Sequence, residues 1–211
     1  MPKRILTAAA AILLLTLTPS LACKGPNVQF SDDFREVDAS WAAEPGNVSV
    51  EEGRVKIKAN PNGGYNLMYN GAPFDDADIC ITVRMPNDVD AKDETAAGLL
   101  FWGVDYDNFY WFAIAPDGKA TLQRKLKGKY SAVVAWKESD QIKIEHGAKN
   151  ALRVTTSGNS ITLWINDAKF GSVKGAVPAG GGLVGLRSES ETAKRDTWKF
   201  SDLKVTDLAP Q

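Results

Sequence analysis

The stretch from Ala97 to Trp136 constrains the fold of this chain more than any other part of it. It contains several apolar or alternating runs of about 7 to 9 residues, a length typical of β-strands. Short segments rich in Asp, Asn, Gly and Pro separate these runs, and such residues favour tight turns. Consecutive strands joined by short turns predict a β-meander.

Strand-like alternation continues outside the meander, from Val28 to Val205. Every second residue is apolar in the clearest segments, which places one set of side chains on a buried face. These segments are residues 55–59, 79–85, 152–156 and 161–165. The polar segment 188–196 predicts a loop or a single helical turn. The expected fold class is all-β, an antiparallel two-sheet sandwich of about a dozen short strands.

The two ends of the domain carry matching strand signals, around Phe30 and between Trp198 and Val205. Pairing of these terminal strands would protect sheet edges from other chains. The apolar parity changes between Phe200 and Leu203, which predicts a β-bulge near Ser201 and Asp202.

The N-terminal segment has the pattern of a secretory signal peptide. Lys3 and Arg4 precede an uncharged apolar run, and small residues precede a cut after Ala22. The apolar run is too short to span a bilayer comfortably, which argues against an uncleaved anchor. We expect residues 1–22 to be the signal peptide, 23–211 to form one domain, and the protein to be periplasmic or secreted.

Charge excludes one class of partner. The chain has 25 Lys and Arg against 26 Asp and Glu, so cleavage after Ala22, which removes Lys3 and Arg4, leaves a formal charge of −3. The densest basic run, residues 124–129, is typical of the solvated side of a strand and its turn. Nucleic acid is therefore not an expected partner, because phosphate binding needs clustered basic residues.

Cys23 and Cys80 are the only cysteines. Cys23 would be the first residue after cleavage, which leaves its sulfur two exclusive fates. Lipid attachment would make the protein a lipoprotein tethered to a membrane, although Ser20 stands where the lipoprotein signal prefers an aliphatic residue. A disulfide with Cys80 is the other fate, and it suits an oxidising compartment.

A series of short motifs follows in order over nearly all of residues 23–211. They are Asp33-Phe34 with Trp41, Val48 with the hairpin 52–55, and the segments 97–102, 107–112, 117–118, 149–154, 163–166, 181–186 and 200–203. In the order and spacing of these motifs, the chain resembles the concanavalin A-like lectin/glucanase superfamily, in its bacterial laminin-G-like form.

The resemblance implies a jelly roll of two curved sheets, a face of which commonly meets carbohydrate or a protein partner. Similar domains include a 3-keto-disaccharide hydrolase-like group and the family-16 glycosidases. The catalytic strand of the latter carries a Glu-x-Asp-x-x-Glu motif, which this sequence lacks, so their active site is not carried over.

Alternation also predicts a ligand-binding platform. If Leu163 and Ile165 are core residues, Trp164 points outward, and the same reasoning places Arg84, Trp102 and Trp111 on an outer face. Indole rings stack on sugar rings, and a guanidinium donates hydrogen bonds to hydroxyls. The alternative is that these aromatic side chains are core residues or are covered by loops.

Two pairs of carboxylates could serve sugar hydrolysis, which needs an acid and a base or nucleophile. Asp105 and Asp107 flank a turn residue, and Glu189 and Glu191 fall in the polar segment near Arg187. Such acids more often cap turns or face solvent.

A cation site and a lone histidine complete the candidates. No cofactor is required, but laminin-G-like domains often bind calcium, and Asp32, Asp33 and Asp202 would meet if the terminal strands pair. The alternative is that these carboxylates bond turn amides. His146 lacks a nucleophile partner in the sequence and is expected at the surface.

Three functions remain open. The first is an extracytoplasmic carbohydrate-binding module without catalytic activity, and the second is a glycoside hydrolase acting on a disaccharide or modified sugar. The third is a structural or adhesive envelope protein. The fold alone does not decide among them.

Overall fold

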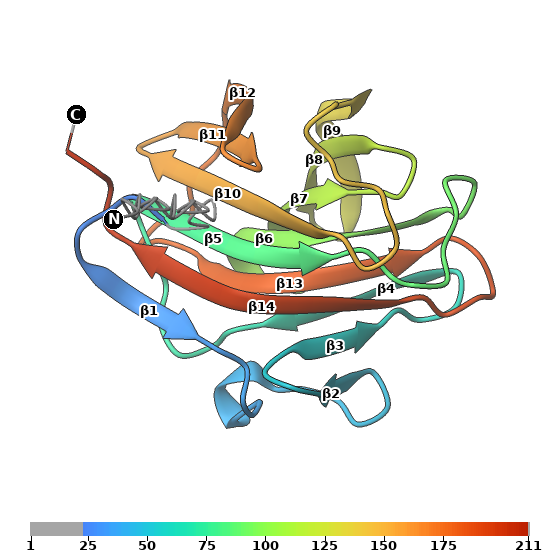
Figure 1. Ribbon diagram of the computed structural model, residues 1–211. Coiled ribbons are helices and arrows are strands. Elements are labelled where there is room, and N and C mark those ends of the chain that lie inside the picture. Colours follow the sequence, from blue (N-terminus) through green and yellow to red (C-terminus); the bar gives the residue numbers. More distant parts are fainter. Residues whose placement is uncertain (1–22, 211) are drawn as a thin grey trace, which may run out of the picture.

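The computed structural model describes residues 23–210, which form two antiparallel β-sheets packed face to face (Figure 1). Sheet A has the spatial order β12 (Ala168–Lys174), β11 (Ser160–Ile165), β10 (Lys149–Ser157), β5 (Ala77–Arg84), β14 (Thr197–Thr206), β3 (Val55–Lys58) and β2 (Val48–Val50), and β1 (Val28–Asp32) also pairs with β14. Sheet B has the order β4 (Gly63–Met68), β13 (Leu183–Ser190), β6 (Thr95–Asp105), β7 (Asn108–Ile114), β8 (Lys119–Leu126) and β9 (Lys129–Glu138). The predicted all-β sandwich is confirmed, and the predicted meander is β6 to β9.

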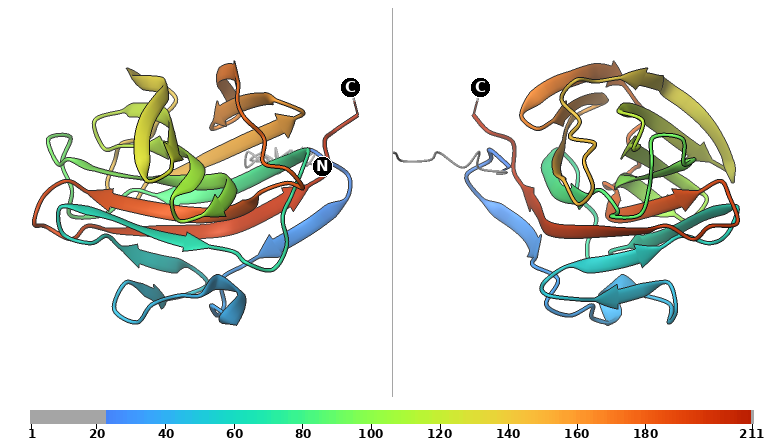
Figure 2. Two further views of the ribbon diagram at one scale, coloured as in Figure 1. Left: turned by 180° about the vertical axis from the view of Figure 1, so that it is seen from behind. Right: turned by 45° about the vertical axis from the view of Figure 1, so that its right-hand side comes forward.

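The main core lies between the two sheets, which curl around it (Figure 2). Sheet A contributes alternate residues such as Ile79, Ile81 and Val83 of β5, and sheet B contributes Leu99 and Phe112. All five side chains are almost completely buried. Each contributes roughly 1.5–3 kcal/mol through removal of apolar surface from water, so the period-two pattern holds the sheets together.

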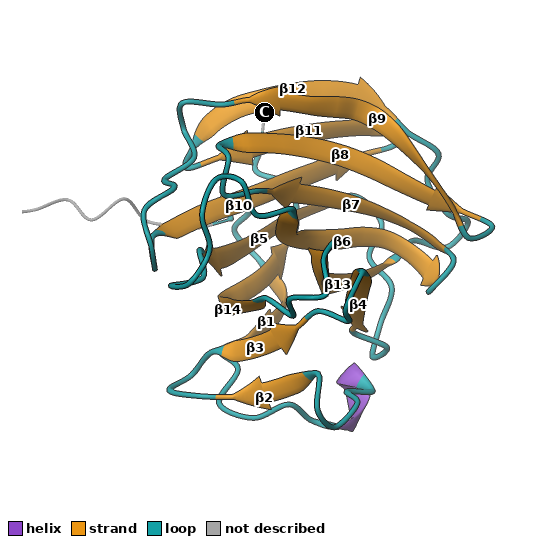
Figure 3. Cartoon of the chain, turned by 90° about the vertical axis from the view of Figure 1, so that its right-hand side faces the viewer, coloured by secondary structure: helices purple, strands orange, loops and turns teal. Residues whose placement is uncertain are grey.

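The edge strands β9 and β12 approach each other along one side of the sandwich (Figure 3). The ammonium group of Lys137 on β9 donates to the carbonyl oxygen of Phe170 on β12 at 3.2 Å. The same ammonium lies 4.3 Å from the centroid of the Phe170 ring. A charge at this position also discourages pairing with other strands.

The terminal strands pair as their sequence patterns predict. Phe30 on β1 lies opposite Val205 on β14. The register between β14 and β5 shifts between Ser201 and Lys204, and Asp202 adopts a positive φ of 58°. This irregularity confirms the predicted bulge and allows both Phe200 and Leu203 to enter the core.

The segment from Ser188 to Ser190 corrects one prediction. We expected residues 188–196 to form a loop or a helical turn, but the first three continue β13 as a strand. Ser188 and Ser190 are buried, and Ser188 donates a hydrogen bond to the Ile57 carbonyl. The polar composition of this segment predicted a loop, but its buried serine hydroxyls form hydrogen bonds inside the fold, so the segment can be a strand.

A disulfide joins Cys23 to Cys80 on β5, with their Cα atoms 5.6 Å apart. Next to it, the buried carboxylate of Asp78 accepts two hydrogen bonds from the guanidinium of Arg153, at 2.7 and 2.8 Å, and one from the Lys24 amide. These contacts tie the start of the described chain to sheet A. The disulfide occupies the Cys23 sulfur that lipid attachment would need.

The predicted signal peptide, residues 1–22, lies outside the described residues. Among residues 23–210, no helix has both the length and the apolar character needed to span a bilayer.

We expect removal of the disulfide to destabilise the fold. The bond closes a long loop, since its cysteines are 57 positions apart, and cross-links of this kind contribute about 2–4 kcal/mol. The double variant Cys23→Ser/Cys80→Ser should therefore unfold at a lower urea concentration than the wild type. Equal midpoints for the oxidised wild type and the double variant would contradict this prediction.

Candidate functional site

The face of sheet B that points away from sheet A is hollowed into a groove. Two adjoining hollows of ≈ 280 and ≈ 260 Å³ share Trp136, Glu189 and Glu191 in their walls, so they form one continuous space. The first is also bordered by residues 91–96 and by Ala115, Asp117 and Lys119. The second is also bordered by Trp111, Gln123 and Tyr130. We call this space the groove.

Strand β13 contributes some of the charged side chains at the groove. Val184 and Leu186 on this strand point into the main core. Arg187 and Glu189 occupy the other parity and therefore lie on the outer face, with Glu191 next in the same series. Strand geometry, which the sequence analysis missed for this segment, thus places the two glutamates in one wall of the groove.

The floor of the groove rests on a small apolar cluster of the outer face, of whose buried residues only Ala96 and Trp111 line the groove itself. Leu100, Phe109, Trp111 and Ala113 are almost fully buried there, although no second sheet covers them. The indole of Trp111 is 2 % exposed, and its Nε1 has no hydrogen-bond acceptor among the described residues. An unpaired buried donor is costly, and this N–H is buried too deeply to reach a ligand in the groove.

Arg187 covers part of this floor. Its guanidinium lies 5.0 Å from the centroid of the Trp111 ring and 5.3 Å from that of Tyr130. It donates to Asn66 Oδ1 at 2.7 Å and forms an ion pair with the Glu189 carboxylate. A Cβ atom at Gly64 would lie 2.3 Å from Cζ of Arg187, so a larger residue there would displace the guanidinium.

Two aromatic rings on the edge strand β9 border the groove on one side. Tyr130 is 45 % exposed and Trp136 is 41 % exposed, while both line the groove. Large rings that combine an accessible face with a fixed position are typical of surfaces that stack on flat or cyclic ligands. Neither residue stands out in the sequence, because the alternation of β9 is weak and gives no sign of which ring is accessible.

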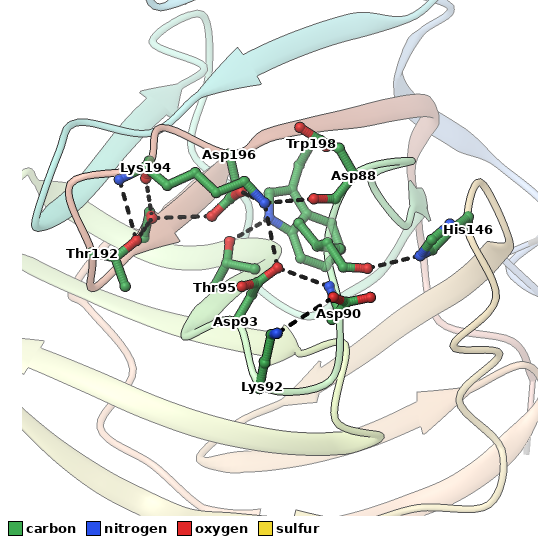
Figure 4. A network of polar contacts seen from close by, with 12 residues as sticks. Asp88, Asp90, Lys92, Asp93, Thr95, His146, Thr192, Lys194, Asp196 and Trp198 are labelled. Atoms are coloured by element: carbon green, nitrogen blue, oxygen red, sulfur yellow. Dashed lines mark hydrogen bonds and ion pairs between the residues drawn. The ribbon is translucent and has the colours of Figure 1, made fainter.

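The opposite border is the loop that precedes β6, and a network of polar contacts holds it (Figure 4). Lys194 forms ion pairs with Asp93 at 3.3 Å and Asp196 at 3.1 Å, and it donates to the Asp88 carbonyl. Trp198 Nε1 donates to Thr95 Oγ1 at 3.0 Å beneath the loop. This border of the groove is therefore built in advance of any ligand.

Glu191 is electrostatically unusual. It remains accessible from the groove, yet burial of its carboxylate raises its pKa, and the carboxylates of Glu189 and Glu94 raise the pKa further. A carboxyl group with a raised pKa in a groove is a common feature of functional sites.

The four residues of the predicted platform do not share a face, and that prediction is wrong. Trp102 adopts a positive φ of 48° at an irregularity of β6, and this turns its indole into the main core, where it is 3 % exposed. Trp111 lies in the floor of the groove on sheet B. Arg84 and Trp164 belong to sheet A, where Arg84 donates to the Gly147 carbonyl and Trp164 stacks against Arg153.

The other acidic pair serves a turn. Asp105 accepts hydrogen bonds from the Asn108 side chain and the Asp107 amide, and these bonds lower the pKa of Asp105. Asp107 forms an ion pair with Lys125 at 3.0 Å. Neither carboxylate lies in the groove wall.

The three aspartates predicted for calcium already have other partners. Asp32 accepts from the Phe34 amide and the Trp41 indole, Asp33 pairs with Arg35, and Asp202 accepts from the Thr82 hydroxyl. Within residues 23–210, the only close trio of potential metal ligands is Cys23, Asp78 and Cys80, whose sulfurs form the disulfide. The terminal strands pair without gathering these carboxylates, and calcium binding itself stays a prediction.

His146 is exposed, and its ring contacts the Val89 carbonyl at 2.9 Å.

Comparison with known proteins assigns the fold. No protein-family model matches the chain, and no curated protein matches its sequence. Among solved structures, carbohydrate binding module CBM66 from Bacillus subtilis is similar with a TM-score of 0.61 at 15% identity, covering 77% of this chain and 92% of that chain.

Two further solved structures are similar. LamAcat from Zobellia galactanivorans has a TM-score of 0.62 at 11% identity, covering 86% of this chain and 98% of that chain. The β-glucanase from Bacillus licheniformis has a TM-score of 0.58 at 8% identity, covering 84% and 97%. The chain therefore has the concanavalin A-like jelly-roll fold, as the sequence resemblance implies.

We expect Glu191→Gln to be slightly stabilising near neutral pH. A carboxyl whose pKa is higher in the folded state destabilises that state once the pH exceeds its unfolded pKa, about 4.3. The amide removes this effect, so the advantage of the variant should disappear below that pH. Urea unfolding of both proteins across a pH series measures it, and a variant that is less stable at neutral pH would contradict it.

Proposed function

We propose that the protein binds carbohydrate in the groove on sheet B. The observation that carries this proposal is the combination of two accessible aromatic rings with several hydrogen-bonding groups in one preformed space. Trp136 and Tyr130 offer faces for the C–H surface of a sugar ring, and Gln123 and the glutamates offer partners for its hydroxyls. A binding module and glycoside hydrolases among the similar structures support the same ligand class.

We also propose that the protein works outside the cytoplasm. The signal-like N-terminal segment and the Cys23–Cys80 disulfide support this location, because disulfides persist in oxidising compartments. Glycans of envelopes and of the surroundings are accessible there.

We expect Trp136→Ala to weaken glycan binding about tenfold, because loss of one stacking surface costs roughly 1–2 kcal/mol. A glycan array would first identify a ligand, and calorimetry would then compare wild type, Trp136→Ala and Tyr130→Ala.

Trp164→Ala is the matched control for this experiment. It also removes an indole, but one on sheet A that does not line the groove, and it should leave the affinity for the glycan unchanged. An affinity that falls with Trp164→Ala but not with Trp136→Ala would place the binding surface elsewhere.

Glycoside hydrolysis is the second candidate function, and Glu191 favours it. Its raised pKa suits a general acid, and Glu189, held by Arg187 on the same strand face, is a second carboxylate next to it. Hydrolysis of a glycosidic bond needs such a pair.

If the groove is catalytic, Glu191→Gln should abolish release of reducing ends from the glycan identified by the array, while binding persists. An amide cannot supply the proton that the leaving oxygen needs. The control is Glu36→Gln, a change at an exposed residue that does not line the groove. Binding without turnover in the wild type would leave the carbohydrate-binding function alone.

A further inference from the structure

We propose that the ligand of the groove carries a protonated amine, as an amino sugar does. This inference rests on the proposed carbohydrate-binding function and adds a ligand class to it. Its starting point is the balance of charge in the groove, since five carboxylates but only two lysines line the larger hollow.

Three of these carboxylates have a cation beside them. Glu189 pairs with Arg187, Asp117 with Lys119 at 2.6 Å, and Asp93 with Lys194 at 3.3 Å. Lys119 is already engaged in this way. The other lysine, Lys92, has a side chain that is 83 % exposed and its nearest carboxylate is that of Asp90, at 4.0 Å.

Glu94 and Glu191 are the two carboxylates left over. Within residues 23–210, neither forms an ion pair with a lysine, an arginine or a histidine. They are neighbours, because the Glu191 amide donates to the Glu94 carbonyl at 2.8 Å, and the Glu94 charge contributes to the raised pKa of Glu191. Two like charges held side by side are relieved by a cation placed between them.

The rest of the groove restricts what that cation is attached to. The Trp136 ring lines both hollows, so a ligand that reaches Glu94 and Glu191 also passes this ring. Indole faces attract ammonium groups and stack on sugar rings. The Gln123 side-chain amide in the adjoining hollow supplies hydrogen-bonding groups for an oxygen atom. A sugar ring that bears both hydroxyls and an ammonium group uses all three features, whereas a bare cation uses only the carboxylates.

Calorimetry with two matched ligands tests the inference. The glucosamine hexamer and the N-acetylglucosamine hexamer share one backbone, and only the first is cationic when its amines are protonated. We expect the wild type to bind the glucosamine hexamer about tenfold more tightly, with a preference that decreases as salt is added.

Variants assign the preference to the two glutamates. Glu94→Gln and Glu191→Gln should each weaken binding of the glucosamine hexamer about fivefold, the effect of losing one accessible charge pair. Binding of the N-acetylated hexamer should not change. Glu36→Gln is the charge-matched control and should behave as the wild type, and circular dichroism spectra establish that all variants are folded.

Equal or tighter binding of the N-acetylated hexamer would overturn the inference, as would a preference for the amine that survives both substitutions. Either result leaves carbohydrate binding in place if Trp136→Ala still weakens it. Binding of calcium ions that depends on Glu94 and Glu191, with no binding of the glucosamine hexamer, would also overturn it. Absence of any glycan binding that responds to Trp136→Ala would instead refute the proposed function.

Discussion

Sheet B has to bury apolar side chains on both of its faces, although sheet A covers only one of them. On the inner face, Leu99, Phe112 and their neighbours are buried in the main core between the two sheets. On the outer face, Leu100 and Trp111 are buried in a small apolar cluster, and Arg187 lies over the ring of Trp111. The groove is therefore a consequence of how this sheet buries its second face, and its polar residues sit on an apolar base.

That base determines what the polar groups can do. A guanidinium that stacks on Trp111 is fixed in orientation and holds the Glu189 carboxylate beside it. The Lys194 network fixes the opposite border in the same way (Figure 4). Binding to a preformed groove loses less side-chain entropy than binding to a mobile surface, so such a groove favours specific recognition. The groove also holds Glu189, Glu94 and Glu191 close together, and the charges of the first two contribute to the raised pKa of Glu191.

Periodicity predicted the strands well and the site poorly. Alternation placed Phe112 inward and Trp111 outward on β7 correctly, because a regular strand turns successive side chains to opposite faces. It failed at Trp102, since one residue with positive φ reverses the parity of a strand. The same alternation in Arg187, Glu189 and Glu191 would have revealed the groove wall, but the polar serines between them concealed the strand.

The sequence by itself determined that the chain forms two antiparallel layers and where its turns fall. It also determined that the terminal strands pair, with a bulge near Asp202. Each of these features depends on local turn chemistry and on a short-range pattern of apolar residues. Only the tertiary structure decided which outward residues share a surface. Trp164 and Trp111 lie in the same kind of alternating pattern, yet they belong to different sheets. The order of the strands within each sheet, and not the neighbouring residues in the sequence, determines the surface on which each ring lies. Glu94 and Glu191 are far apart in the chain, and the pairing of β13 with β6 brings them together.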